Sequence, residues 1–416
     1  MRTRKDQELR LLLVPGKDYP TDHAMLETIY AKILPQQGVS VTWIMRAHVD
    51  ALPRESWHES TVVTVPTHRV GEQTIPVNRW LAWFRLLAGM SRESRKLRPD
   101  VVQVRNSVTA GLMAWWLRRR DGSSFVYQVS FPVPESLARA ARQGRTRLPL
   151  LRAAQARAQL WLRARLLRRA DLVLAISDEM RDRFIAAGTD PQKVMSFPLG
   201  SDLPISPPGT TLRRRRQELG VGEDPLVLYF GTIAPDRQLG FLLDVAALVR
   251  PRFPAARWIL IGPASEGEDE RLRVEIAARD LGEEIRVLPR IARTDLTTTI
   301  AAADVVVSPI PMDPLFIISS PTKTVEALAQ ARPVVGTPIP DQAALIRESG
   351  GGVVAPFDPA PFAIAVCDLL ENPSGATEMG GNGQRYVIEH RSYARLASSV
   401  LDRYRQIARS SGGSGG

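Results

Sequence analysis

Uninterrupted apolar runs alternate with helical patterns along almost the whole chain, and this alternation limits the possible folds more than any other feature. A strand that is apolar at every position must be buried on both faces, which requires helices on both sides of a parallel sheet. Strands are predicted at 9–14, 39–45, 61–65, 101–104, 125–129, 171–176, 194–197, 226–230, 258–261, 285–288, 305–307, 334–335 and 353–354. The chain is therefore predicted to be an α/β protein.

A Pro/Gly-rich stretch divides this alternation into two halves. Pro204, Pro207, Pro208 and Gly209 lie within 201–209, and such clusters are typical of linkers. We therefore predict two Rossmann-like domains that face each other across a cleft, with boundaries at 1–200 and 201–385. Ligands of open α/β sheets bind at the carboxyl ends of strands and at helix N-termini. The active site is accordingly expected in that cleft.

Composition excludes several classes of protein. The chain is 44% hydrophobic and 24% charged, which is typical of globular domains. Its single cysteine, Cys367, excludes a disulfide scaffold and a Cys-based zinc site. None of the histidines (His23, His48, His58, His68 and His390) has metal-ligand spacing, and there is no Asp-x-Asp motif, so no metal is expected. Most of the histidines are expected on the surface, and His23, which follows the first strand, is the one whose position would allow it to approach the cleft.

Two further absences concern location. No apolar run is long enough to span a membrane as a helix, and the basic start of the chain lacks the apolar core of a signal peptide. A cytoplasmic protein is expected. The last residues, 410–416, have the composition of a linker or tag and are excluded from the fold prediction.

The positive charge of the chain is concentrated in one segment. Of a formal net charge of +11, residues 137–170 carry ten arginines and no acid, interleaved with leucines and Trp161. Gly144 and Pro149 are expected to interrupt the helix early in this segment. A basic amphipathic helix can lie on an anionic membrane, and a basic patch can bind nucleic acid. It can also be a solvated arginine face. We favour the membrane, and no nucleic-acid-binding motif is present.

One motif is specific. Residues 319–329 read Ser-Ser-Pro-Thr-Lys-Thr-Val-Glu-Ala-Leu-Ala, followed by Arg-Pro-Val-Val at 332–335. This resembles the donor-site signature of the family 4 glycosyltransferases, in which a Ser-Pro-x-Lys-x-x-Glu helix start precedes a Pro-Val-Val strand. Segments that agree with the family in order lie at 170–177, 193–202, 229–237, 260–262 and 349–352. The resemblance covers about 170–409 and implies the two-domain GT-B architecture, with helices at 386–409 that cross back to the first domain.

The resemblance implies roles for the residues that match its motifs. Backbone N–H groups at the helix start and the charges of Lys323 and Arg237 would stabilise the leaving nucleoside diphosphate. Glu326 matches the glutamate that binds the ribose hydroxyls. The predicted donor-binding set is Gly16, Gly231, Thr232, Arg237, Gly262, Ser320, Pro321, Thr322, Lys323 and Glu326. As alternatives, Lys323 and Glu326 could form a helix-surface ion pair, and Arg237 could be a solvated loop residue.

The sequence departs from the family at several positions. The first motif glutamate, eight residues before the second, is Ile318 here, which leaves the donor sugar open. Asp313 could substitute for it or could cap a turn beside Pro314. Many members carry a histidine near 127–132, where this chain has Ser130. We include Ser130 with Arg237 and Lys323 as a catalytic candidate, although a turn role before Pro132 is an alternative.

The sequence as a whole predicts a metal-independent glycosyltransferase that uses a UDP- or GDP-linked sugar and no cofactor, and the family resemblance implies that it retains the configuration of the sugar. The expected acceptor is a lipid-linked sugar in bacterial polysaccharide or glycolipid assembly, at the inner face of the cell membrane. Two alternatives remain open. One is a nucleotide-sugar epimerase of the same fold. The other is a non-catalytic nucleotide-sugar-binding subunit, which the loss of the glutamate at Ile318 favours.

Overall fold

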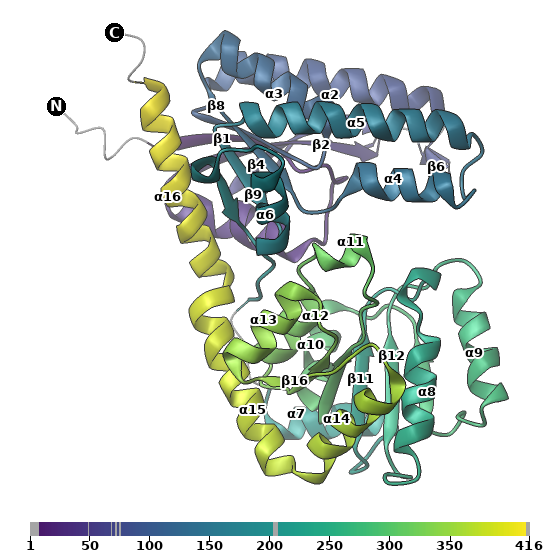
Figure 1. Cartoon of the computed structure of the whole chain (residues 1–416). Helices are drawn as coiled ribbons and strands as arrows, with labels where there is room; N and C mark the ends of the chain where they lie inside the picture. The colour runs from purple at the N-terminus through teal and green to yellow at the C-terminus, as the bar shows by residue number, and fades with distance from the viewer. Residues whose placement is uncertain are drawn as a thin grey trace. The chain divides into compact units, whose positions relative to one another are not determined.

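The computed structural model describes residues 8–48, 50–67, 69–70, 73–74, 76–202 and 207–412. The chain divides into two compact units, which are Met1–Pro198 together with Tyr393–Gly416 (unit 1) and Leu199–Ser392 (unit 2). Each unit is a sheet with helices on its faces (Figure 1). The chain passes from unit 1 to unit 2 after Pro198 and returns to unit 1 after Ser392. A hydrogen bond joins the first and last segments of unit 2, in which the Ser201 amide donates to the Arg391 carbonyl at 3.1 Å.

Unit 1 is built on an eight-stranded sheet with the order β10-β9-β8-β7-β1-β2-β4-β3. Every pairing is parallel except that of β3 with β4. The strands are β1 Leu9–Val14, β2 Val39–His48, β3 Arg54–Trp57, β4 Ser60–Thr67, β7 Val101–Arg105, β8 Ser124–Val129, β9 Leu172–Ala175 and β10 Val194–Ser196. A separate hairpin is formed by β5 (Arg69–Val70) and β6 (Gln73–Thr74). The sequence did not predict β3, because this edge strand is polar and largely exposed and so leaves no apolar run.

The helices of unit 1 are η2 Leu26–Ile33 (a π-helix), α1 Leu34–Gln36, α2 Pro76–Leu97, α3 Val108–Asp121, α4 Val133–Arg142, α5 Pro149–Arg169, α6 Asp178–Ala186, η3 Pro191–Lys193 and α16 Tyr393–Gly412. The predicted interruption of the basic segment is confirmed. Helix α4 ends at Arg142, Gly144 has a φ of +68°, and α5 begins at Pro149. Residues 410–412, which were predicted to belong to a linker or tag, form the last part of α16. Residues 413–416 lie outside the described residues.

Helix α16 is part of the packing of unit 1 (Figure 1). The Tyr404 hydroxyl donates to Gln103 Oε1, and the Gln103 amide donates to the Tyr30 hydroxyl at 2.9 Å. The same amide donates to Gln128 Oε1 at 3.0 Å. All four side chains are buried. A polar network buried this deeply stabilises only one arrangement of its members, so it fixes how α16 lies against β7 and η2.

Unit 2 is built on a fully parallel sheet with the order β13-β12-β11-β14-β15-β16. The strands are β11 Leu226–Phe230, β12 Arg257–Ile261, β13 Ile285–Leu288, β14 Val305–Ser308, β15 Val334–Gly336 and β16 Gly352–Val354. The helices are α7 Gly209–Glu218, η4 Pro235–Arg237, α8 Gly240–Val249, α9 Glu268–Ala278, α10 Arg293–Ala302, α11 Pro314–Ile317, α12 Thr322–Ala329, α13 Pro340–Ser349, α14 Pro359–Glu371, α15 Pro373–Tyr386 and η5 Val387–Arg391.

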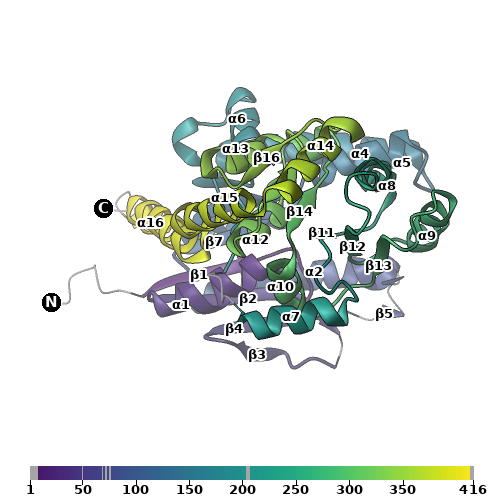
Figure 2. The ribbon, with the colours of Figure 1, turned by 90° about the horizontal axis from the view of Figure 1, so that it is seen from below.

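Successive residues of the unit 2 strands enter different cores. Val227 and Tyr229 of β11 belong to the core beneath α8 and α14, whereas Leu228 and Phe230 belong to the core beneath α12. Figure 2 shows the sheet between α8 and α14 on one side and α10 and α12 on the other. Because both faces are covered, every position of such a strand must be apolar. This confirms the physical basis of the strand prediction.

Among the described residues, no helix is long and apolar enough to cross a membrane.

Candidate active site

The first feature of the site is the start of α12, which follows Pro321. Pro321 occupies the N-cap position with φ −75° and ψ 114°, and Thr322 is the first helical residue. Val325 and Leu328 are buried against the sheet and fix the helix. The N–H groups of the first turn have no intrahelical acceptors, and the helix dipole adds partial positive charge there. This end of α12 is therefore suited to an anion.

Lys323 lies in this first turn with its ammonium nitrogen 4.7 Å from the centre of the Tyr229 ring. Burial of the ammonium and the positive charge of Arg237 lower the pKa of Lys323 to about 7, while the Glu326 carboxylate acts in the opposite direction. No carboxylate in the described part of the chain forms an ion pair with Lys323. The alternative of a surface ion pair with Glu326 is therefore not what the structure contains.

Arg237 supplies the second positive charge, from the loop between β11 and α8. It ends the short helix η4, and Gln238 follows it with a φ of +51°. Its guanidinium carbon lies 4.5 Å from the centre of the Phe316 ring, in α11. Arg237 is half-buried and, within the described ranges, has no ion-pair partner. Two cations that are not neutralised by protein carboxylates thus act on each other at one edge of the sheet.

Glu326 lies one turn after Lys323 and is half-buried. Burial raises the pKa of Glu326 to about 6, the positive charge of Arg293 opposes this rise, and the negative charge of Asp202 adds to it. Arg293 is itself paired with Asp202, at 2.8 Å. Over the described residues, the Glu326 carboxylate accepts no hydrogen bond. It therefore retains the capacity to accept two hydroxyl groups.

Two glycines allow the ends of β11 and β12 to approach each other. Gly231 has a φ of +139°, and a Cβ there would lie 3.1 Å from the Lys323 nitrogen. A Cβ on Gly262 would lie 1.8 Å from the Gly231 carbonyl oxygen. A side chain at Gly262 would thus collide with backbone, whereas one at Gly231 would displace Lys323. Thr232 is exposed, and its carbonyl accepts a hydrogen bond of 3.0 Å from the Tyr229 hydroxyl.

Ser320, a predicted donor-binding residue, has a structural contact. The residue is only 5% exposed, and its hydroxyl accepts a hydrogen bond of 3.1 Å from the Leu199 amide. This bond ties the segment that enters unit 2 to the start of α12. The structure therefore gives Ser320 a positioning role at the site.

A buried polar network behind α12 was not predicted from the sequence. Thr324 donates to Gln342 Oε1 at 2.7 Å, and the Gln342 amide donates to the Thr337 carbonyl at 2.9 Å and the Ser308 carbonyl at 3.1 Å. The Thr337 hydroxyl donates to the Ile310 carbonyl at 2.7 Å. These bonds hold α12 against the ends of β14 and β15. The only sequence signal was polar residues at otherwise apolar positions.

The region before α12 shows how the departure from the family motif is accommodated. Ile318 is 5% exposed, so an apolar side chain fills the position of the missing glutamate. The Asp313 carboxylate accepts from the Leu315 amide at 2.9 Å and caps α11. This is the capping role that was one of its two predicted alternatives. Phe316, which the sequence did not single out, lies against Arg237.

The other predicted site residues lie in unit 1, at the carboxyl ends of its strands. Gly16 follows β1 with a φ of +66°, and a Cβ there would lie 2.9 Å from the Arg105 carbonyl oxygen. Ser130 follows β8, and its hydroxyl accepts from the Asn106 amide at 3.0 Å. Asn106 Oδ1 in turn accepts from the Ser130 backbone amide at 2.8 Å. Ser130 is therefore part of a turn stabilised by Asn106, with its hydroxyl still half-exposed.

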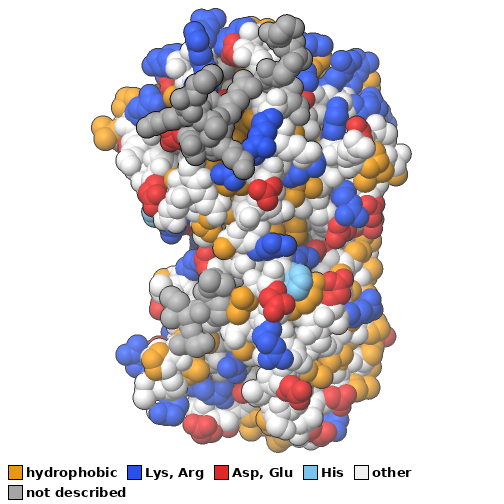
Figure 3. Space-filling model, turned by 90° about the vertical axis from the view of Figure 1, so that its left-hand side faces the viewer, with side chains coloured by type: hydrophobic (Ala, Val, Ile, Leu, Met, Phe, Trp, Pro, Cys, Tyr) orange, Lys and Arg blue, Asp and Glu red, His pale blue; other side chains and the backbone are white. Residues whose placement is uncertain are grey.

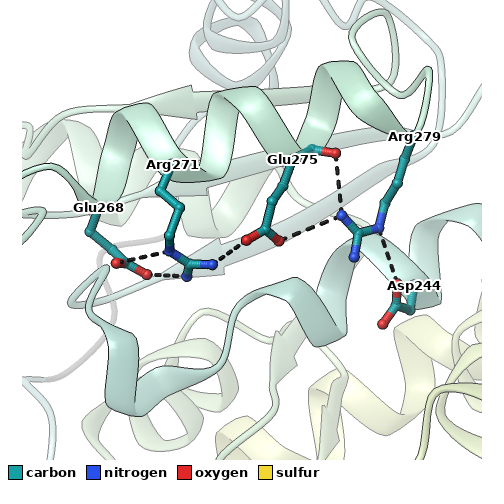
Figure 4. Close-up of polar contacts among 5 residues, drawn as sticks. All are labelled: Asp244, Glu268, Arg271, Glu275 and Arg279. Carbon is teal, nitrogen blue, oxygen red and sulfur yellow. Dashed lines mark hydrogen bonds and ion pairs between the residues drawn. The ribbon is translucent and has the colours of Figure 1, made fainter.

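Unit 2 also holds an open groove of about 580 Å³ beside η4. It is lined by Pro235, Gln238, Gly240, Phe241, Asp244, Arg271, Arg279, Phe357 and Pro359. Figure 4 shows that both of its arginines are neutralised, because Arg271 bonds to Glu268 and Glu275, and Arg279 bonds to Glu275 and Asp244. Since these cations are paired, the groove lacks the uncompensated charge found at Lys323 and Arg237.

The basic segment forms a continuous exposed face along α5. Leu150, Ala154, Trp161, Arg165 and Arg168 recur at helical spacing and are exposed, with Leu150 89% and Trp161 56% accessible. Arg165 covers the Trp161 ring at 3.9 Å. On the neighbouring helix α3, Arg119 covers Trp115 at 4.0 Å and Arg120 covers Trp116 at 4.6 Å. Elsewhere basic and acidic side chains are interspersed, as on the face in Figure 3.

One arginine of the segment does not belong to this face. Arg163 is only 8% exposed, and both of its terminal nitrogens bond to the Glu135 carboxylate of α4. It therefore joins α4 to α5 inside unit 1. The sequence could not separate it from its exposed neighbours, because the register of α5 against α4 decides which arginines are buried.

In the described part of the chain, no group of three or more His, Cys, Asp or Glu side chains is arranged to hold a metal ion. Of the five histidines, His68 lies outside the described residues.

Comparison with solved structures defines the class of the fold. The structure of HepE from Anabaena, in complex with UDP, aligns over 96% of this chain and 100% of its own, with a TM-score of 0.70 and 19% identity. Sucrose-phosphate synthase from Thermosynechococcus elongatus aligns over 97% of this chain and 100% of its own, with a TM-score of 0.73 and 19% identity. The chain has the GT-B fold of two Rossmann-like units.

Sequence comparison identifies the family. Residues 30–200 match the family described as "Glycosyl transferase 4-like domain", and residues 224–372 match "Glycosyl transferases group 1". The chain belongs to the group 1 glycosyltransferase family. It is 29% identical over 255 residues to the D-inositol 3-phosphate glycosyltransferase of Kineococcus radiotolerans, an alignment that covers 57% of each protein. The chain thus spans little more than half the length of the curated relatives that it matches.

Proposed function

We propose that the chain transfers a sugar from a nucleotide-sugar donor to an acceptor hydroxyl, with retention of configuration and without a metal ion. The observation that carries this proposal is the pair of unneutralised cations, Lys323 and Arg237, at the open N-terminus of α12. A diphosphate is the ligand whose charge and size match two cations and a helix start. Glu326, one turn further on, accepts the ribose hydroxyls of the same nucleotide.

The proposed chemistry needs no conspicuous base. The acceptor oxygen attacks the anomeric carbon on the face from which the nucleoside diphosphate departs. The carbon–oxygen bond to the diphosphate breaks, and its electron pair stays on the diphosphate. The acceptor proton moves to an oxygen of that diphosphate. Lys323, Arg237 and the α12 amides stabilise the developing negative charge, and this is the main contribution of the protein to the rate.

Thermal unfolding in the presence of UDP-, GDP-, ADP- and dTDP-sugars tests the donor site. A bound donor at 100 times its dissociation constant stabilises the protein by about 2.7 kcal/mol. One nucleotide should raise the unfolding midpoint, and Lys323→Ala should abolish the rise. Arg273→Ala on the exposed side of α9 is the control and should respond as the wild type does. A donor response that is the same in Lys323→Ala would contradict the site.

We further propose that the acceptor is a lipid-linked sugar, reached from an anionic membrane surface in the cytoplasm. The exposed Leu, Trp and Arg side chains of α5 support this, because such a face combines apolar insertion with attraction to anionic headgroups. Co-sedimentation with vesicles tests it. Arg157, Arg165 and Arg168→Gln should reduce binding to anionic vesicles, whereas Arg213, Arg214 and Arg273→Gln in unit 2 removes the same charge and should not.

Two functions other than sugar transfer are considered, a non-catalytic nucleotide-sugar-binding subunit and a nucleotide-sugar epimerase. A non-catalytic nucleotide-sugar-binding subunit is favoured by the buried Ile318 at the motif position of the first glutamate. Such a protein would bind the donor but never release free nucleotide with an acceptor present. An epimerase would convert the donor sugar without any acceptor, so incubation of the donor alone and analysis of its sugar distinguishes that activity.

A further inference from the structure

Unit 1 contains a buried arginine that has no part in the proposed sugar transfer as described above. Arg105 is the last residue of β7 and is only 6% exposed. Its terminal nitrogens lie 3.0 Å from His23 Nε2 and 3.4 Å from the Pro15 carbonyl oxygen. No atom of the described residues accepts a hydrogen bond from its Nε. No carboxylate within the described part of the chain pairs with Arg105. Burial lowers the pKa of Arg105 to about 10, so the guanidinium is still charged at neutral pH.

A second cation lies beside this arginine. Lys17 follows the Pro15–Gly16 turn after β1, and its pKa is lowered by partial burial and by the positive charge of Arg105. The acid next in the chain, Asp18, is paired with Arg46 at 2.9 Å. The carboxyl ends of two adjacent parallel strands, β1 and β7, thus bring together two positive charges, and no carboxylate of the described residues compensates them.

The other buried charges in the described part of unit 1 are compensated, which makes the uncompensated charge of Arg105 informative. Arg163 bonds to Glu135, and Glu93, 1% exposed, is paired with Arg54 and Arg92. A buried charge without a partner is strongly unfavourable. Residues held in such a state are concentrated at functional sites, where a ligand supplies the missing charge. The Nε–H of Arg105 retains the donor that such a ligand would use.

We propose that Arg105 and Lys17 bind an anionic group, a phosphate, carried by the acceptor. This inference rests on the proposed transfer reaction and names the substrate class of its second partner. The donor diphosphate already has its own cations, Lys323 and Arg237, within unit 2. A neutral acceptor would leave Arg105 uncompensated in every state of the enzyme.

Inorganic phosphate is the first probe, titrated into the full chain in the Lys323→Ala background so that the unit 2 site does not contribute. Phosphate should raise the unfolding midpoint, and Arg105→Gln should weaken its apparent affinity at least tenfold. Lys17→Gln should weaken it several-fold, and Arg105→Lys should weaken it less than Arg105→Gln. Arg95→Gln, an exposed arginine of α2, is the matched control and should have no effect.

Two outcomes would overturn the inference. One is the absence of any phosphate response in Lys323→Ala although the protein with Lys323 intact binds its donor nucleotide. The other is a response that Arg105→Gln and Lys17→Gln leave unchanged. If Arg105→Gln does not fold, Lys17→Gln decides, because that side chain is exposed. Failure of the proposed function itself is recognised separately, because the protein with Lys323 intact would then bind no nucleotide.

The source of the phosphate is decided with two acceptor classes. Transfer to a free sugar phosphate is compared with transfer to a polyprenyl-phosphate-linked sugar presented in detergent micelles. Arg105→Gln should raise KM for the acceptor that is used at least tenfold, with little change in kcat and no change in donor affinity. A fall in kcat with an unchanged KM would contradict a role in acceptor binding.

Discussion

The Lys323 ammonium lies 4.7 Å from the centre of the Tyr229 ring. The ring face favours the charged ammonium, whereas burial and the nearby charge of Arg237 disfavour it. The result is a pKa of about 7, so the free protein holds this cation only part of the time at neutral pH. A bound diphosphate would add negative charge and restore the proton. Lys323 would therefore couple nucleotide binding to proton uptake.

Nucleotide binding at pH 8 should be accompanied by the uptake of up to about one proton. Lys323 is largely neutral in the free protein at this pH and becomes charged when the diphosphate arrives. Calorimetry in buffers of different ionisation enthalpy measures the number of protons. Lys323→Arg should bind with no uptake, because arginine is charged throughout this pH range. Equal uptake in both proteins would assign the proton to another group.

The stability of the free protein should depend on Lys323 in a defined pH window. The pKa is lower in the folded state than in the unfolded state, so the unfolded state binds more protons between pH 7 and about 10. The free energy of unfolding therefore gains from this group as the pH rises through that window. Lys323→Met should stabilise the protein most below pH 7, by about 1 kcal/mol once partial exposure is taken into account. Its advantage should shrink toward pH 10, as urea unfolding at several pH values would measure.

Glu326 should recognise the ribose through its ionised carboxylate. Two hydrogen bonds to a charged acceptor contribute about 1.5–3 kcal/mol each, so Glu326→Ala should weaken nucleotide binding about 100-fold or more. The pKa of about 6 predicts that wild-type affinity falls as the pH drops through 6. A 2′-deoxy nucleotide should bind the wild type more weakly than the ribonucleotide. Glu326→Ala should bind the two alike, and a persistent preference for the ribonucleotide would remove Glu326 from the ribose site.

The glycines at the ends of β11 and β12 should respond differently to alanine. Gly262→Ala places a Cβ 1.8 Å from a backbone oxygen and should destabilise unit 2 by about 3 kcal/mol or more. Gly231→Ala meets a flexible side chain but carries a strained φ of +139°, so about 1–2 kcal/mol is expected, together with weaker donor binding. Gly282→Ala meets nothing within 4 Å and is the control. Thermal unfolding and nucleotide titration separate the two effects.

Tyr404→Phe should destabilise unit 1 by about 1–3 kcal/mol, because Gln103 loses the hydroxyl that donates to its buried carbonyl. Tyr386→Phe is the matched control. Its hydroxyl donates to the exposed Glu348, and water can replace that contact, so less than about 1 kcal/mol is expected. Equal losses in the two variants would show that burial of the Gln103 network adds nothing.

The sequence by itself determined the α/β class and every strand of the two large sheets except β3, because a strand buried on both faces is a local apolar run. It also placed Lys323 and Glu326 one turn apart on one helix, since that spacing is fixed by helix geometry. Neither result needed knowledge of long-range contacts. The edge strand β3 was not predicted, because an exposed edge strand does not require an apolar run.

Only the tertiary structure decided which polar residues are paired. It showed that Arg163 is bonded to Glu135, whereas Arg105 has no carboxylate partner among the described residues, and that Ser320 is bonded to the Leu199 amide. It also assembled Thr324, Gln342 and Thr337 behind α12. The physical reason is that pairing depends on which strand ends and helix faces meet. Arg163 and Glu135 are 28 positions apart and Ser320 and Leu199 are 121 apart, so local sequence patterns carry no record of these contacts.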